Sequence, residues 1–128
     1  MSVSILTCKN WKNCFLVAEK FNMPILDITQ NSIDWSFEKY ILIFSNRGDE
    51  ELPPEMEHFL INLKIENKKY QICELGNDFG FERPFGSALI VYNILNKLKW
   101  ILTTPIYSLD TVPNIDWNSL NLWISNEI

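Results

Sequence analysis

The sequence has few cysteines, one histidine and no uninterrupted apolar run long enough for a membrane-spanning helix. Its three cysteines, Cys8, Cys14 and Cys73, are an odd number without CxxC spacing, which argues against both a disulfide framework and a zinc site. Its longest apolar stretches are interrupted by Lys, Asp, Asn or Pro well before the roughly 18 residues that a membrane-spanning helix needs. We therefore expect a soluble cytoplasmic protein whose cysteines are reduced and mostly buried.

Positive charge is also scarce, since 11 Lys and Arg residues are outnumbered by 16 Asp and Glu residues and the formal net charge is -5. Sequence-independent binding of nucleic acid requires clustered Lys and Arg, so this composition argues against it and favours basic protein partners. The only histidine, His58, falls opposite the apolar stripe of a predicted helix. This position indicates a surface residue rather than an acid, a base or a metal ligand. No Cys–His–Asp nucleophile set is present either.

Five short apolar runs rich in β-branched residues predict β-strands. These runs are Val3 to Leu6, Pro24 to Ile28, Tyr40 to Phe44, Tyr70 to Cys73 and Trp100 to Tyr107. Their hydrophobicity is continuous rather than alternating, most clearly in residues 40–44. Such continuity is typical of a parallel sheet that is covered by helices on both faces.

Apolar residues recur at i, i+3, i+4 and i+7 in most of the intervening segments, which predicts amphipathic helices. The three clearest sets are Cys14, Val17, Ala18 and Phe21; Met56, Phe59, Leu60 and Leu63; and Ala88, Val91, Tyr92 and Leu95. Pro53-Pro54 suits a first helical turn, and Asp116 is placed to cap a last helix that carries Trp117, Leu120 and Ile124 on one face.

The alternation of strands and helices predicts a single α/β domain over residues 1–128, with a doubly wound parallel sheet. The 47% apolar content is enough for one core of ordinary size. The segment from Gln30 to Lys39 is too short for a full crossover helix, because a parallel connection usually needs a dozen residues or more. We therefore expect a degenerate turn there.

The chain has only four glycines, and they are placed after two of the predicted strands. Gly48 follows the third strand, while Gly76, Gly80 and Gly86 follow the fourth. Glycine lets a backbone take positive φ or approach a ligand closely, and ligands of open α/β sheets bind at the carboxyl ends of the strands. Two glycine-bearing loops therefore predict a ligand site at one sheet edge, the alternative being that both are simple turns.

Residues 75–85 read Leu-Gly-Asn-Asp-Phe-Gly-Phe-Glu-Arg-Pro-Phe, which resembles the pattern that flavodoxins carry after the fourth strand. There the family typically reads Gly-Asp, a spacer, Gly-Tyr, three residues and Phe. On this resemblance Gly76, Gly80 and Phe85 match, Phe81 takes the place of the tyrosine that stacks on the flavin, and Asn77 replaces the usual aspartate. The alternative is that Phe79, Phe81 and Phe85 are core residues, and for Phe85 we prefer it.

A second segment, Asn46 to Pro53, is similar to the family's loop after the third strand, where a glycine and a Glu-Leu step are common. The resemblance makes Gly48 the glycine whose peptide faces flavin N5. Arg47 stands where many members carry a tryptophan, so one aromatic wall of the usual flavin sandwich is missing.

The loop after the first strand departs from the family, because Cys8-Lys9-Asn10-Trp11-Lys12-Asn13-Cys14 stands where flavodoxins read Ser/Thr-x-Thr-Gly-x-Thr. The hydroxyls and the glycine that serve the FMN phosphate are absent. Phosphate binding at such a loop relies largely on backbone N–H groups and on a helix N-terminus, so the site can survive their loss. Asn10 and Asn13 can donate amide hydrogens, and Lys9 or Lys12 can add positive charge.

The resemblance implies a flavodoxin-like sheet of strand order 2-1-3-4-5 and a monomeric FMN-binding protein that carries single electrons between a reductase and acceptor enzymes. The cofactor-binding residues that it implies are Lys9, Asn10, Trp11, Lys12, Asn13, Asn46, Arg47, Gly48, Leu75, Gly76, Asn77, Phe79, Phe81 and Phe85. Glu50, Glu51, Asp78 and Glu82 would give an acidic rim for basic redox partners, or merely a solvated face. Two alternatives remain, a cofactor-free interaction module and a flavodoxin-like activator of ribonucleotide reductase.

Overall fold

The fold is described from a computed structural model of residues 1–128, and the structure describes residues 2–46, 51–76 and 86–128. Strands and helices alternate along most of the chain. In order they are β1 (Val3–Thr7), α1 (Lys12–Glu19), β2 (Ile25–Asp27), β3 (Lys39–Ser45), α2 (Pro54–Asn62), β4 (Lys69–Gly76), α3 (Ser87–Lys97), β5 (Ile101–Leu102), β6 (Tyr107–Asp110) and α4 (Trp117–Glu127).

The strands form one parallel sheet of order β2-β1-β3-β4-β5, with β6 also paired to β4. In the register of the sheet Ile5 faces Ile41 across β1 and β3, and Leu42 faces Ile72 across β3 and β4. Residues 40–44 of β3 and residues 70–75 of β4 are buried throughout. The predicted order 2-1-3-4-5 and the burial of the sheet on both faces are therefore confirmed.

The outermost strand next to β4 differs from the single run predicted from Trp100 to Tyr107. It is divided into β5 and β6, which pair with the two ends of β4, and it continues to Asp110. Pro105 lies between the two pieces and has no N–H to donate to a ladder, which confines it to the edge of a sheet or to an interruption. The hydrogen-bond ladder between β4 and β5 reaches only as far as Thr103, whose N–H donates to the Tyr70 carbonyl at 3.0 Å.

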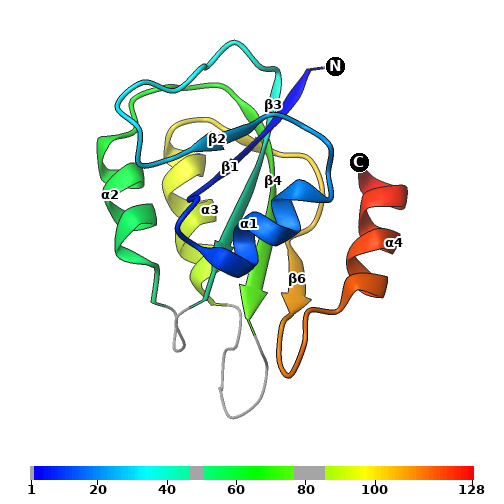
Figure 1. Ribbon diagram of the computed structural model, residues 1–128. Helices are drawn as coiled ribbons and strands as arrows, with labels where there is room; N and C mark the ends of the chain where they lie inside the picture. Colours follow the sequence, from blue (N-terminus) through cyan, green and yellow to red (C-terminus); the bar gives the residue numbers. More distant parts are fainter. Residues whose placement is uncertain (1, 47–50, 77–85) are drawn as a thin grey trace.

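Helices cover both faces of the sheet, as the continuous hydrophobicity of the strands predicted (Figure 1). On one face α2 and α3 pack over the alternate strand residues Leu6, Leu42 and Ile72. On the other face α1 and α4 pack over Ile5, Ile41 and other odd-numbered strand residues. The buried positions of the first three helices follow the predicted periodicity, and in α4 the buried residues are Leu120 and Trp123.

The cap of α4 is the one that the sequence predicted. The Asp116 side chain accepts a hydrogen bond from the Ser119 N–H at 3.1 Å and so satisfies one of the first free donors of the helix. The helix is held against the sheet by Trp123, whose ring stacks on Tyr107 of β6 with 4.6 Å between centroids.

The connection from β2 to β3 contains no helix over residues 28–38, all of which are described, so the predicted degenerate turn is confirmed. Hydrogen bonds fix its course: the Lys68 ammonium donates to the Trp35 carbonyl at 2.6 Å and the Tyr40 hydroxyl to the Asp34 carbonyl at 3.0 Å. Trp35 itself stacks on Phe59 of α2, with 6.3 Å between centroids.

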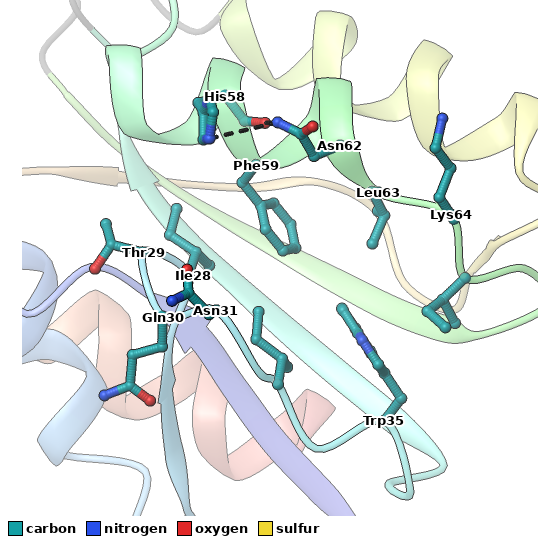
Figure 2. A pocket seen from close by; sticks show the side chains of 12 residues that line it. Ile28, Thr29, Gln30, Asn31, Trp35, His58, Phe59, Asn62, Leu63 and Lys64 are labelled. Atoms are coloured by element: carbon teal, nitrogen blue, oxygen red, sulfur yellow. Dashed lines mark hydrogen bonds between the residues drawn. The ribbon is translucent and has the colours of Figure 1, made fainter.

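An irregular segment covers less of a sheet face than a helix about 10 Å wide would. Between this connection and α2 there is a hollow of about 420 Å³ (Figure 2). Ile28 and Phe59 line it, and Thr29, Gln30 and Asn31 border the side formed by the connection.

Candidate functional site

The carboxyl ends of β1, β3 and β4 meet at one edge of the sheet, toward which the arrowheads of β3 and β4 point in Figure 1. Ser45 pairs with Leu75 in the register, and the Asn46 N–H donates to the Leu75 carbonyl at 2.8 Å. The segments that follow β3 and β4 therefore start side by side. This confirms that the glycine-bearing loops begin at a common sheet edge.

A hollow of about 350 Å³ opens at this edge between α1 and the segment before α2. Trp11, Lys12, Asn13, Ser45 and Pro53 line it. Three of the five predicted phosphate-loop residues are thus brought together with the end of β3.

The other two predicted residues of the first loop are placed differently. Lys9 and Asn10 are exposed in a turn that is closed by a hydrogen bond from the Trp11 N–H to the Cys8 carbonyl at 3.0 Å. Neither residue is among the described residues that line the hollow. Their role as ligands stays a prediction.

Several predicted site residues lie outside the described residues. They are Arg47, Gly48, Asn77, Phe79, Phe81 and Phe85, together with Glu50, Asp78 and Glu82 of the predicted acidic rim. The remaining member of that rim, Glu51, is exposed.

The N-terminus of α1 begins with a residue that does not cap it. Trp11 occupies the N-cap position with an extended backbone (φ −87°, ψ 95°), and its side chain makes no capping hydrogen bond. No acidic residue lies in that turn either. The backbone N–H groups at the start of a helix carry a partial positive charge, so a helix start beside a hollow suits an anion.

The indole N–H of Trp11 is a further donor of the N-cap residue of α1. The Trp11 ring packs against the apolar clusters of both sheet faces, which fixes it at the strand ends. Its Nε1 atom is buried and has no hydrogen-bond partner among the described residues. A buried donor without an acceptor costs about 1–3 kcal/mol, so a ligand acceptor at this position would recover that energy.

The three cysteines are free and buried, as predicted. The Sγ atom of Cys14 lies 3.3 Å from the Ser45 hydroxyl, and burial raises the pKa of the Cys14 thiol to about 11. Burial also raises the pKa of Cys8 and, more strongly, that of Cys73. Because the thiolate is the reactive form, these cysteines contribute packing rather than nucleophilic chemistry.

Glu74 is a residue that the sequence analysis did not single out. It lies in β4 two residues before Gly76 and is completely buried, and its Oε2 atom accepts a hydrogen bond from the Ser87 hydroxyl at 2.6 Å. Burial raises the pKa of Glu74 to about 7, although hydrogen bonds from Ser87, the Ala88 backbone and Asn46 favour the ionised form. The carboxyl group thus links the starts of both glycine-bearing segments to the first turn of α3.

A signal for Glu74 was present in the sequence, since it is a charged residue within a strand that is otherwise apolar toward its end. Lys, Glu, Arg and Asp are almost never fully buried unless they are paired. Its partner, Ser87, follows 13 residues later and is recognisable only once the fold brings β4 and α3 together.

His58 is exposed on α2, as predicted, and is hydrogen-bonded within its helix to Asn62, whose amide donates to the His58 carbonyl at 2.9 Å. Within the described ranges, no group of three or more His, Cys, Asp and Glu side chains is arranged to hold a metal ion. No helix formed by the described residues is long and apolar enough to cross a membrane.

Comparisons by sequence found no match: neither a protein-family model nor a curated protein matches the chain. Solved structures do match over nearly the whole chain. Flavodoxin 2 from Bacillus cereus is 17% identical with a TM-score of 0.76, covering 98% of this chain and 96% of its own. A mutant of the flavodoxin from Pseudomonas aeruginosa is 18% identical with a TM-score of 0.74, covering 98% of this chain and 95% of its own.

A further match is the flavodoxin of Fusobacterium nucleatum bound to flavin mononucleotide, which is 16% identical with a TM-score of 0.66 and covers 97% of this chain and 93% of its own. Identities this low establish the shared architecture, and the strand order and helix placement described above agree with it. The chain therefore has a flavodoxin-like α/β fold.

Proposed function

We propose that this protein binds FMN at the carboxyl edge of its sheet and carries single electrons between redox proteins. The observation that supports this most directly is the hollow beside the start of α1, which Trp11, Lys12 and Asn13 line and where the N-cap side chain makes no capping hydrogen bond. In the same fold, the flavodoxin of Fusobacterium nucleatum is bound to flavin mononucleotide.

The residues present fit the phosphate end of such a cofactor. A phosphate at the start of α1 would accept hydrogen bonds from backbone N–H groups of the first turn and would be stabilised by the helix dipole, a contribution of about 0.3–1 kcal/mol. The exposed side chains of Lys12 and Asn13 add a positive charge and an amide donor at the rim of the same hollow. These groups replace the hydroxyls that flavodoxins use.

The flavin end of the site rests on the resemblance, because the residues assigned to it lie outside the described residues. Asn46, Leu75 and Gly76 place the starts of both loops at the edge where Trp11 lies. We propose that Gly48 and Phe81 then contact the flavin ring, Phe81 by stacking, a contact of about 0.5–1.5 kcal/mol beyond area burial.

FMN supplies the electron-transfer chemistry when bound, and the protein supplies binding, orientation and electrostatics. The net charge of -5 disfavours further negative charge on a reduced cofactor. It also suits association with basic partners. We place this role in the cytoplasm, in an electron carrier rather than an enzyme with its own substrate.

The experiment is an absorption titration of the purified protein with FMN and with riboflavin, followed by anaerobic reduction with dithionite. We expect FMN to bind and to be reduced in two separable one-electron steps. Trp11→Phe should weaken FMN binding about tenfold, since it removes a hydrogen bond to a charged group, while riboflavin binding changes little. Trp117→Phe on α4 is the matched control.

Equal weakening of FMN and riboflavin by Trp11→Phe would contradict the phosphate assignment. A protein that binds neither flavin would favour the cofactor-free interaction module. Binding of FMN together with activation of a ribonucleotide reductase would favour the third candidate.

A further inference from the structure

The outer surface between α2 and α3 carries an apolar groove that the ligand edge does not use. The two helices lie on the same face of the sheet (Figure 1), and the groove between them has a volume of about 700 Å³. Its apolar walls come from Leu60 and Ile61 of α2 and from Ile90 and Ile94 of α3.

Not all of the apolar side chains in this groove are buried in the core of the protein. Leu60 is buried, but Ile61 remains 69% exposed, and Ile90 and Ile94 are only half-buried. An exposed isoleucine with others beside it in a groove is a typical feature of an interaction surface rather than of a solvated helix face.

The charges around the groove select the kind of partner. Glu51 and Glu57, both exposed, lie at its rim near the start of α2, and none of the described residues that line it is basic. A second copy of this chain would bring the same acidic rim and a net charge of -5, and anionic lipid headgroups would be repelled as well. A partner with Lys or Arg beside an apolar anchor is complementary to this pattern.

The geometry points to a docking site, between α2 and α3, for an amphipathic helix of a partner protein that presents an aliphatic stripe flanked by basic residues. The aliphatic side chains of the partner helix occupy the space over Ile61, Ile90 and Ile94, and the basic residues of that helix pair with Glu51 and Glu57. A helix laid into a hydrophobic groove is a common mode of peptide recognition. This inference does not rest on flavin binding, because no residue named for the flavin lines the groove; it shares only Glu51 with the acidic rim predicted for redox partners.

The test uses the full chain, with and without FMN, and two synthetic helical peptides that share a leucine stripe. One peptide has lysines beside the stripe and the other has glutamates, and binding is followed by fluorescence anisotropy. We expect the lysine peptide to bind at least about tenfold more tightly than the glutamate peptide. Ile61→Ser should weaken the lysine peptide about tenfold, since the isoleucine loses its burial against the peptide, and Glu57→Lys should weaken it as well.

Two matched controls distinguish binding in the groove from nonspecific hydrophobic binding and from an effect of net charge. Leu122→Ser removes an aliphatic side chain that is 64% exposed on α4, and Glu38→Lys reverses an exposed charge before β3. Both controls should bind the lysine peptide like the unmodified chain. Because Ile61 is mostly exposed, Ile61→Ser should keep its fold, which thermal denaturation checks.

The inference is overturned if Ile61→Ser and Leu122→Ser have equal effects, or if the two peptides bind equally. It is also overturned if the chain sediments as a dimer that Ile61→Ser dissociates, because the groove would then hold a second copy. Ile61-dependent binding to anionic lipid vesicles would overturn it in favour of a membrane surface.

Discussion

Replacing Glu74 by glutamine should change how stability depends on pH. In the folded protein burial raises the pKa of Glu74 from its ordinary value of 4.5 to about 7, so the folded chain binds a proton at this site more tightly than the unfolded chain does. The stability associated with this group is therefore complete below pH 4.5 and is lost as the pH rises toward 7. Above pH 7 the ionised carboxylate is buried in the folded state.

The size of the effect follows from the separation of the two pKa values. One pKa unit corresponds to about 1.4 kcal/mol, so the shift from 4.5 to about 7 corresponds to about 3 kcal/mol of unfolding free energy as an upper limit. Glutamine stays neutral at every pH, and its carbonyl oxygen can accept the hydrogen bond that Ser87 now donates to Glu74. Glu74→Gln should therefore match the unmodified chain near pH 4 and be more stable by up to about 3 kcal/mol near pH 8.

The assay is urea denaturation of both chains across this pH range, with the difference between their unfolding free energies plotted against pH. Subtraction removes the titration of every group that the two chains share. Glu66→Gln, at an exposed carboxyl, is the control for the removal of one negative charge. A flat curve for Glu74→Gln, or a variant that is less stable at pH 8, would refute the argument that the ionised form is disfavoured by burial.

Two further predictions concern the last helix and the predicted flavin loop. Asp116→Ala removes the side-chain cap of α4 and should lower the unfolding free energy by about 1 kcal/mol, which chemical denaturation measures against Glu66→Ala at an exposed carboxyl. Phe81→Ala should weaken FMN binding clearly more than Phe79→Ala in a fluorescence titration, because only Phe81 is assigned to stack on the flavin. Equal losses would contradict the loop alignment.

The sequence predicted the layers of the fold because two periodicities are clear in it. The unbroken apolar run at residues 40–44 identified a central parallel strand, and the spacing of Met56, Phe59 and Leu60 identified the buried side of α2. Both signals are local and need no knowledge of distant contacts. The same is true of Asp116, whose acceptor atom serves a donor only three residues away.

The misplaced features depend on contacts that are distant in the sequence. The last strand was predicted as one run because Trp100 to Tyr107 is apolar, but Trp100 is instead buried against Tyr40 and Tyr70, and pairing with β4 resumes only at Tyr107. At the start of α1, Trp11, Lys12 and Asn13 line one hollow, whereas Lys9 and Asn10 are not among the described residues that line it, and the role of all five as ligands stays a prediction. Hydrophobic pattern alone does not determine the direction of an irregular loop.

The short outer strands of the sheet bear on how this chain behaves at high concentration. At one edge of the sheet β2 has only three residues. At the other edge the hydrogen-bond ladder with β4 is interrupted around Pro105, between β5 and β6. A long, regular border would expose a row of unpaired N–H and C=O groups onto which another chain could add a strand. Here each edge strand is too short or too irregular to serve as such a template. The architecture therefore disfavours aggregation by strand addition without a protective helix at either edge.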